Sequence, residues 1–295
     1  MTHLRKVGVA GGGLMGAGIA QVAALAGFDT VVREVSEGLA ARARTSIEKG
    51  LAKGIEKGKV TAAQRDESLA RLTFVTTLDA FADCDVIIEA VVEAMPAKQE
   101  LWRSLDPVAR PECIFATNTS SLSVAEQGNV TTRPDRFVGM HFFNPVPAMR
   151  LVEIVRTVAT SDATVEAVTG FARLLGKEAI VARDTPGFVV NLLLVPYMLD
   201  AVRACEQNVA SVHDIDVGMQ LGAGHPMGPL ALCDQVGLDT LERVAGILYE
   251  GYRERRYAPP PLLRRMVASG WLGRKNGRGF YDYSTEPPAP MAPVG

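Results

Sequence analysis

A histidine and a glutamate that each lie inside an apolar run are the residues of this chain best suited to proton transfer. His141 follows the apolar residues 137–140, and Glu153 lies within the apolar segment 151–155. A carboxylate is costly to bury unless it is paired. Pro147 lies midway between the two residues, so a chain reversal centred on it would place Glu153 opposite His141. A histidine oriented by a carboxylate is a general base whose charged form is stabilised.

The alternative for His141 is a histidine that is simply satisfied within the core, and its position alone favours neither interpretation. The other histidines are weaker candidates: His3 lies near the N-terminus, His213 beside two aspartates, and His225 in a loop rich in glycine and proline. Because Glu153 would otherwise be an unpaired charge in an apolar strand, the catalytic interpretation of His141 is favoured. Such a base suits the oxidation of an alcohol, in which the hydroxyl proton leaves as hydride is transferred.

A glycine-rich loop near the N-terminus predicts a dinucleotide site. Gly11, Gly13 and Gly16 have the spacing G-x-G-x-x-G, with Leu14 and Met15 between the last two. The first glycine permits a tight turn, the second lets the backbone approach a pyrophosphate, and the third lets helix and strand pack closely. The helix N-terminus then offers N–H donors to the phosphates. Glycines also form ordinary turns, so the motif gains its weight from the strand predicted before it and the helix predicted after it.

Glu34 supplies the acidic residue that such a site needs at the end of the second strand. Its spacing from Gly16 is close to that at which a carboxylate binds the ribose hydroxyls. A 2′-phosphate would meet this carboxylate, which favours NAD over NADP as the cofactor. Arg33 could tolerate that phosphate, although the side chains of residues 33 and 34 point to opposite faces if both lie in a strand.

Short apolar strands alternate with helices through the first part of the chain. The predicted strands are 6–10, 29–35, 72–75, 85–91, 113–117, 137–142, 151–155 and 178–183, and the helices include 14–26, 36–57, 95–109 and 163–175. This alternation predicts an α/β fold with a parallel, doubly wound sheet of Rossmann type. The carboxyl ends of the strands line the ligand crevice of such a sheet, and His141 would lie at one of them.

The turn Asp184-Thr185-Pro186-Gly187 ends the alternation. Beyond it the pattern is helical, over 188–207, 212–221, 238–254 and 262–269. We therefore expect a nucleotide-binding domain at 1–184, an all-α C-terminal domain at 185–283, and a proline-rich, disordered tail at 284–295. Two domains also agree with a length of 295 residues, which is more than one core usually organises.

Composition and charge argue against several classes of function. A net charge of −2 at pH 7 gives no field that would attract nucleic acid. The four cysteines are scattered and the histidines do not cluster, which predicts neither a metal site nor a disulfide framework and favours a reducing compartment. The longest apolar run, 188–199, is too short to span a bilayer, and the first strand begins too early to leave room for a signal peptide. We expect a cytoplasmic protein that does not enter the membrane.

Several segments, in the same order, closely resemble those of the 3-hydroxyacyl-CoA dehydrogenase family in its short-chain form. They are the glycine-rich loop, Asn118-Thr119-Ser120-Ser121-Leu122, residues 139–145, residues 151–155 and Asp184-Thr185-Pro186-Gly187-Phe188. The resemblance covers about residues 4–283. It implies NAD-dependent oxidation of a short-chain (S)-3-hydroxyacyl-CoA, such as 3-hydroxybutyryl-CoA, and the reverse reduction, in fatty-acid or butyrate-type metabolism.

The same resemblance implies roles for individual side chains. His141 is the base and Glu153 its partner, Ser120 contacts the 3-oxygen of the substrate as well as the cofactor, and Asn191 completes the site from the second domain. Serines also cap helices, and Ser123-x-x-Glu126 has the pattern of a capping box. We therefore interpret Ser121 and Ser123 as structural.

Further cofactor contacts are implied for Glu93, Lys98, Asn144 and Lys275. Glu93 follows the strand 85–91, so a place at the crevice also agrees with the strand order. Asn276 stands where the family usually has threonine, and this departure lies directly beside Lys275.

Lysines along the helix 36–57 could face a CoA moiety. Lys49, Lys53 and Lys57 recur every fourth residue, and they are offset by about 200° from an apolar stripe on the same helix. An ordinary solvated face is the simpler interpretation for Lys49 and Lys53. The resemblance implies that Lys57 contacts the acyl-CoA, whereas Gly50 stands where some relatives carry a serine that contacts CoA.

Two alternatives stay open from the sequence. A dehydrogenase of similar fold could act on a hydroxy acid or sugar acid without CoA, or a catalytically idle NAD-binding protein could serve structure or sensing. The lysines near the cleft and the set Ser120, His141, Glu153 and Asn191 disfavour both. Apolar stretches of the second domain, such as 192–195, are more than a domain of its size readily hides. A homodimer formed through that domain is therefore expected, as the resemblance also implies.

Overall fold

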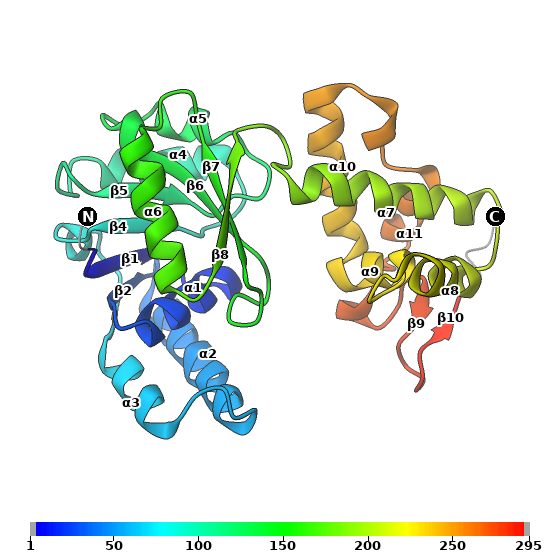
Figure 1. The fold of residues 1–295 in the computed structure, drawn as a ribbon, viewed down its shortest axis with the longest axis horizontal. Coiled ribbons are helices and arrows are strands. Elements are labelled where there is room, and N and C mark those ends of the chain that lie inside the picture. The colour runs from blue at the N-terminus through cyan, green and yellow to red at the C-terminus, as the bar shows by residue number, and fades with distance from the viewer. Residues whose placement is uncertain (1–3, 292–295) are drawn as a thin grey trace. The chain divides into compact units, whose positions relative to one another are not determined.

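The structure, a computed structural model, describes residues 4–291. The chain divides into two compact units, with the boundary in the sequence between Thr185 and Pro186. The first unit holds an eight-stranded sheet with helices on its faces, and the second consists mainly of helices (Figure 1). The predicted fold class, a Rossmann-type domain followed by a helical domain, is confirmed. His3 and residues 292–295 of the expected tail lie outside the described residues.

The first unit is a doubly wound sheet. Its strands are β1 (Lys6–Ala10), β2 (Asp29–Arg33), β3 (Leu72–Val75), β4 (Val86–Glu89), β5 (Ile114–Thr117), β6 (Phe137–Phe142), β7 (Leu151–Arg156) and β8 (Glu178–Arg183). Its helices are α1 (Leu14–Leu25), α2 (Glu37–Glu56), α3 (Ala62–Ala70), α4 (Met95–Leu105), α5 (Val124–Gly128) and α6 (Asp162–Leu174), with short turns η1 (Asp79–Phe81) and η2 (Pro134–Arg136). The spatial order is β3-β2-β1-β4-β5-β6-β7-β8. The order reverses between β1 and β4, which is where a doubly wound sheet opens its ligand crevice.

Alternate side chains of each central strand point to opposite faces of the sheet. One face packs against α1, α2 and α6 in an apolar core that includes Val7, Ile88 and Met140. On the opposite face, Trp102 of α4 packs against Phe115 and Phe137. The strand parity places four polar side chains on this second face: Glu89, Thr117, His141 and Glu153.

Strands β6 and β7 form the antiparallel pair that the position of Pro147 predicts. In their register His141 lies opposite Glu153, and the other neighbouring pairs from β1 to β6 are parallel. Lys177, between α6 and β8, holds the segment that connects β6 to β7. Its buried ammonium donates to the carbonyl oxygens of Val146 (2.5 Å) and Met149 (2.8 Å). The conformation of this loop is therefore tied to the start of β8.

The second unit packs its helices around one apolar core. The elements are α7 (Val190–Glu206), α8 (Val212–Ala223), α9 (Pro229–Val236), α10 (Leu238–Tyr252), η3 (Arg255–Tyr257), α11 (Pro261–Ala268), η4 (Arg274–Asn276), β9 (Tyr281–Asp282) and β10 (Ala289–Pro290). Leu199 of α7, Leu230 of α9, Leu241 of α10 and Leu263 of α11 are all buried in this core. Among residues 4–291, no helix is long and apolar enough to cross a membrane.

Two aspartates, the partly buried Asp184 and the buried Asp216, cap short helices from a distance in sequence. Asp184 accepts hydrogen bonds from the N–H groups of Val124 and Ala125 at the start of α5, and Asp216 accepts from those of Leu230 and Ala231 at the start of α9. A carboxylate is favourable at a helix N-terminus, because the first N–H groups have no partner within the helix and carry positive partial charge. The helix α9 thus obtains its cap from a tertiary contact, and α5 has such a contact in addition to its local cap by Ser123.

The structure adds elements to those predicted and revises the tail. The helices α3, α5 and α9 are absent from the predicted set, and residues 289–290, expected to be disordered, form β10, which pairs antiparallel with β9. Thr61 and Gln64 form a capping box at α3, and Ser123 accepts from the N–H of Glu126 at α5. Ser123 is therefore structural, as predicted. These helices escape prediction because they are short and their apolar periodicity is weak.

Candidate active site

The glycine-rich loop joins the carboxyl end of β1 to α1 and has the geometry of an anion cradle. Gly11 has a φ of +97°, in the left-handed region that favours glycine. A Cβ on Gly16 would collide with the carbonyl group of Gly11, whereas a Cβ on Gly13 would meet nothing within 4 Å. The helix begins without a side-chain cap or an acidic residue in its first turn, within the part of the chain described. The N–H groups at Leu14 and Met15 therefore face space that an anion can occupy.

Arg33 is the last residue of β2 and Glu34 follows it, so the two do not share a strand as the parity argument required, but their side chains still have different partners. The Oε1 atom of Glu34 accepts a hydrogen bond of 2.6 Å from the N–H of Gly12 in the glycine loop. The Nε atom of Arg33 donates instead to the carbonyl oxygen of Thr76, at 3.1 Å. The carboxylate thus lies beside the loop, and the guanidinium is held on the segment that follows β3.

The catalytic candidates His141 and Glu153 meet across β6 and β7. The Nδ1 atom of His141 lies 2.7 Å from Oε2 of Glu153, and the two residues are 6% and 0% exposed. A carboxylate can accept a hydrogen bond but not donate one, so Nδ1 carries the proton and Nε2 is the basic nitrogen. If Nε2 takes up a second proton, the imidazolium is stabilised by the charge of Glu153. The pair can therefore remove a proton from a substrate and return it.

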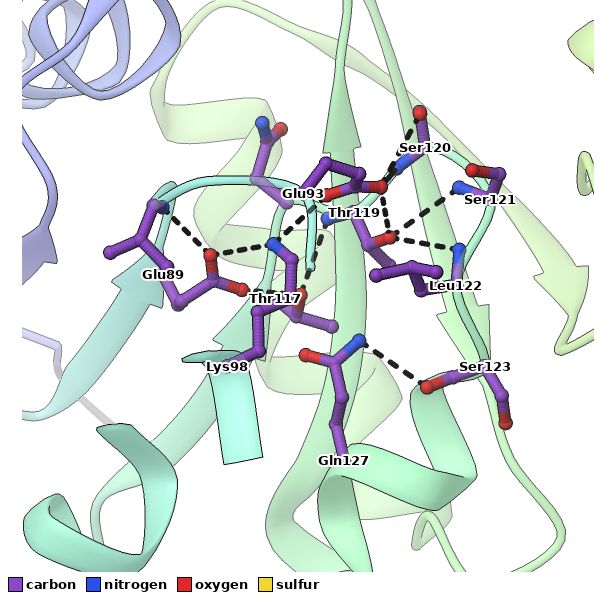
Figure 2. Close-up of polar contacts among 12 residues, drawn as sticks. Glu89, Glu93, Lys98, Thr117, Thr119, Ser120, Ser121, Leu122, Ser123 and Gln127 are labelled. Carbon is purple, nitrogen blue, oxygen red and sulfur yellow. Dashed lines mark hydrogen bonds and ion pairs between the residues drawn. The ribbon is translucent and has the colours of Figure 1, made fainter. Parts of the chain in front are cut away.

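The loop after β5 carries Ser120 and is tied to the neighbouring strand ends. Oε1 of Glu93 accepts from the Thr119 hydroxyl (2.5 Å) and from the Ser120 N–H (3.0 Å) (Figure 2). Oδ1 of Asn118 accepts from the N–H of Phe142, at 2.9 Å, so the same loop is bonded to the residue that follows His141. Ser120 is thereby fixed between the carboxyl ends of β4 and β6.

Lys98 joins Glu93 to a second carboxylate, Glu89. Its ammonium lies 2.6 Å from Oε1 of Glu89 and 3.0 Å from Oε2 of Glu93, and Lys98 and Glu89 are 1% and 0% exposed. Burial alone raises the pKa of Glu93, but Lys98 and the hydrogen bonds from Thr119 and Ser120 outweigh burial and hold that pKa below its usual value. Glu93 is therefore charged at neutral pH.

Glu89 belongs to this site but is not among the residues singled out from the sequence. Its Oε2 also accepts from the Thr117 hydroxyl at 2.7 Å, and its Oε1 from the N–H of Val91 at 2.8 Å. The signal was available, since Glu89 ends the run Val86-Ile87-Ile88-Glu89, and a carboxylate at the end of a buried strand needs partners. Lys98, whose cofactor contact stays a prediction, has these two carboxylates as its ion-pair partners.

A cavity of about 760 Å³ lies on the other face of the sheet, between α1, α2 and the loop after β6. Lys57 and Asn144, both predicted site residues, contribute to its lining. Lys53, Lys59 and Arg150 also line it, and Lys49 does not. Lys53 is exposed, as expected for a solvated face, and its side chain also borders the cavity. Its basic lining suits an anionic ligand.

Gly50 leaves room that a buried amide occupies. A Cβ at position 50 would collide with Oε1 of Gln21 on α1, and Gln21 is 6% exposed and also lines the cavity. The glycine therefore lets a carboxamide occupy this part of the wall. An amide can both donate and accept hydrogen bonds.

The remaining predicted residues, Asn191 and Lys275, belong to the second unit. Asn191 lies in the first turn of α7, and Lys275 lies in η4, where it forms an ion pair with Asp239. Asn276 accepts from the N–H of Leu272 and donates to the carbonyl oxygen of Gly270. Asn276 thus closes the loop that carries Lys275.

Comparisons with known proteins identify relatives along most of the chain. Residues 6–185 match the NAD-binding domain of the 3-hydroxyacyl-CoA dehydrogenases, and residues 187–283 match their C-terminal domain. The chain is 46% identical to a 3-hydroxybutyryl-CoA dehydrogenase of Bradyrhizobium diazoefficiens, over 97% of this chain and 98% of that protein. It is 44% identical to the human mitochondrial hydroxyacyl-coenzyme A dehydrogenase, over 95% and 91% of the two chains.

A solved structure is equally similar. The (S)-3-hydroxybutyryl-CoA dehydrogenase of Ralstonia eutropha superposes with a TM-score of 0.93 at 42% identity, over 96% of this chain and 100% of that one. Identity at this level over nearly the full length goes well beyond a shared fold. The chain therefore belongs to the 3-hydroxyacyl-CoA dehydrogenase family.

Proposed function

We propose that this protein is an NAD-dependent dehydrogenase that oxidises a short-chain (S)-3-hydroxyacyl-CoA, such as 3-hydroxybutyryl-CoA, to the 3-oxoacyl-CoA and catalyses the reverse reduction. The observation that carries the proposal is the buried pair His141–Glu153 at the crevice end of a sheet that also bears a dinucleotide loop. The similarity to proteins named 3-hydroxybutyryl-CoA dehydrogenase supports a CoA thioester as the substrate. Fatty-acid or butyrate-type metabolism is the corresponding setting.

The residues at the strand reversal fit NAD. The missing Cβ at Gly13 leaves space for the pyrophosphate, and the N-terminus of α1 offers N–H donors to it. Glu34, already bonded to Gly12, has further acceptor sites for ribose hydroxyls. The residues proposed to bind the cofactor are Gly11, Gly13, Leu14, Met15, Gly16, Glu34, Glu93, Lys98, Ser120, Asn144 and Lys275. When bound, NAD supplies the acceptor for the hydride.

The protein's own contribution is to hold the substrate and move one proton. Nε2 of His141 removes the proton of the 3-hydroxyl, while Nδ1 keeps its hydrogen bond to Glu153. The charge of Glu153 stabilises the imidazolium that results, and in the reductive direction the imidazolium returns the proton. Ser120 and Asn191 are proposed to hold the 3-oxygen, and Ser120 is kept in place through Glu93. Lys57 is proposed to bind the anionic end of CoA in the basic cavity.

The proposal is tested by following NADH absorbance with the purified protein. Acetoacetyl-CoA should be reduced, and free acetoacetate or a keto-sugar acid should be reduced far more slowly, because neither can use the basic cavity. Preference for the acid without CoA would favour the alternative dehydrogenase. No oxidation of NADH with any of them, while NADH still binds, would favour a non-catalytic NAD-binding protein.

We further propose a homodimer formed through the second unit. Leu193 of α7 and Leu221 of α8 are 63% and 83% exposed within one chain, and Val209 between them is also exposed. Apolar side chains left in water on neighbouring elements are typical of a subunit interface. Light scattering at micromolar concentration should give twice the 31.5 kDa chain mass, and Leu193→Glu should reduce it. A single-chain mass for the unmodified protein contradicts the dimer.

We also propose that the enzyme works in the cytoplasm. Its four cysteines are free thiols, which is the state that a reducing compartment maintains. Fractionation of the source cells should recover the dehydrogenase activity with a cytoplasmic marker. Recovery with a membrane or exported fraction would contradict this location.

A further inference from the structure

Three charged side chains form a buried cluster at the strand ends, and the chemistry of proton removal does not use two of them. Glu89 and Glu93 share the single ammonium of Lys98, so the cluster carries a net charge of minus one (Figure 2). Glu89 and Lys98 are almost completely buried. Burying a pair of charges is rarely favourable in comparison with apolar packing, and burying an excess charge is less favourable still. Stability alone therefore gives a poor account of this cluster.

Hydrogen bonds from Glu89 and Glu93 connect the end of β4 to the end of β5 and to the loop that carries Ser120. Glu89 binds the Val91 N–H and the Thr117 hydroxyl, and its carbonyl oxygen accepts from the Asn118 N–H at 2.8 Å. Glu93 binds the Ser120 N–H in the same loop as Asn118. Removal of the Lys98 link would leave two carboxylates facing each other, so Glu89 and Lys98 act on Ser120 by fixing Glu93.

The cluster lies where the strand order reverses. Glu89 is the last residue of β4, next to the carboxyl end of β1, and a Cβ on Gly11 would meet the backbone of Ala90. A dinucleotide in this fold spans the reversal, with one nucleotide on each half of the sheet. Glu34, at the end of β2, marks the half that holds the adenosine ribose. The ends of β4 and β5 therefore belong to the half that holds the nicotinamide.

We propose that Glu89 and Lys98 are positioning residues that, together with Glu93, impose a fixed negative charge beside the nicotinamide half of the site and so favour NAD⁺ over NADH. The inference rests on the proposed use of NAD. The nicotinamide ring is positively charged in NAD⁺ and neutral in NADH, and the remaining groups of the two forms are alike. A net negative charge nearby therefore stabilises the oxidised form selectively, and its removal should change the ratio of the two affinities.

The test measures the dissociation constants of NAD⁺ and NADH separately, by calorimetry and by NADH fluorescence, for the unmodified protein and for Glu89→Gln. This substitution keeps the shape and one acceptor oxygen while it removes the charge. A unit charge about 12 Å away, across an effective dielectric constant of about 20, changes an affinity roughly 10-fold. We expect Kd for NAD⁺ to rise on the order of 10-fold more than Kd for NADH.

Glu100→Gln is the matched control, because it removes the same charge from the exposed side of the same helix, α4. It should leave the ratio of the two constants unchanged. Glu93→Gln removes the charge from the more exposed carboxylate of the cluster and should shift the ratio in the same direction as Glu89→Gln, which keeps the test open if Glu89→Gln does not fold.

Equal weakening of NAD⁺ and NADH in the folded variants would mean that the cluster has a structural role alone, and would overturn the inference. A shift of the ratio toward NAD⁺ would overturn it as well. Failure of the unmodified protein to bind either form would instead contradict the proposed function, so the two failures are distinguishable.

Discussion

At the scale of single residues, the site is defined by what each side chain is bonded to. Glu34 and Arg33 are adjacent, yet one is bonded to Gly12 of the glycine loop and the other to Thr76. The backbone N–H of Gly12 holds Oε1 of Glu34 in place, so the negative charge of the carboxylate stays beside the loop. Arg33 would have to give up its bond to Thr76 before it could approach a 2′-phosphate. We therefore expect the single carboxylate of Glu34 to decide the choice of cofactor.

Replacement of that carboxylate tests the cofactor choice. Glu34→Ala should weaken NADH more than NADPH, because it removes both the ribose acceptor and the charge that repels a 2′-phosphate. Binding constants for the two cofactors provide the measurement, with Glu37→Ala, at the exposed start of α2, as the control. Equal or better use of NADPH by the unmodified protein contradicts the assignment.

Lys57 provides a second test at this scale. Lys57→Ala should raise KM for acetoacetyl-CoA and leave turnover nearly unchanged, since the lysine binds a part of the substrate that does not react. With acetoacetyl-pantetheine, which lacks the nucleotide, the same variant should behave like the unmodified enzyme. Lys49→Ala is the matched control, because Lys49 lies on α2 but does not line the cavity. An unchanged KM in Lys57→Ala would mean that Lys57 does not bind CoA and is an ordinary solvated lysine.

At the scale of elements, buried carboxylates connect pieces of chain that local sequence does not join. Asp234, on α9, accepts from the N–H groups of Phe280 and Tyr281 and from the Tyr283 hydroxyl. These bonds hold the segment after η4 against α9. The hydroxyl of Tyr281 in turn donates to the carboxylate of Asp216. The second unit therefore contains two acidic groups within one buried network.

Asp234 gives this unit a defined dependence on pH. Burial raises its pKa from an ordinary 3.8 to about 6, against the lowering effect of the hydrogen bonds from Phe280, Tyr281 and Tyr283. A carboxyl whose pKa is raised by folding contributes stability that is fully present below about pH 4 and is lost as pH rises through 6. The loss is about 1.4 kcal/mol for each unit by which the folded pKa exceeds the unfolded pKa.

Comparison with Asp234→Asn isolates this contribution. The free energy of unfolding of the unmodified protein, minus that of the variant, should decrease as pH is raised from 4.5 to about 7. Urea unfolding at several pH values provides the measurement. A difference that stays constant or increases over that range would contradict the raised pKa.

At the scale of the whole molecule, the features predicted from the sequence are those encoded in local periodicity. Strands 6–10, 72–75 and 137–142 have the predicted bounds, because each is a largely apolar run between turn residues, and the strand-like run 178–183 has its predicted bounds as well. The position of Glu153 opposite His141 could be predicted because both lie at equal distances from Pro147 in a two-strand reversal. The contacts of Glu89 with Lys98, and of Gln21 with the space at Gly50, join elements through tertiary packing, which a single sequence does not encode locally.

The central claim, that His141 and Glu153 work as one base, is tested most directly by a double-mutant cycle on turnover. His141→Ala should lose roughly 10²–10⁴-fold in kcat, the usual worth of a general base, and NADH binding should survive because the glycine loop and Glu34 are untouched. Glu153→Gln keeps the shape but removes the charge that stabilises the imidazolium, so kcat should fall here too. Because the carboxylate acts through the imidazole, the double variant should be little worse than His141→Ala alone. Losses that multiply in the double variant would mean that the two residues act independently, and would contradict the paired-base mechanism.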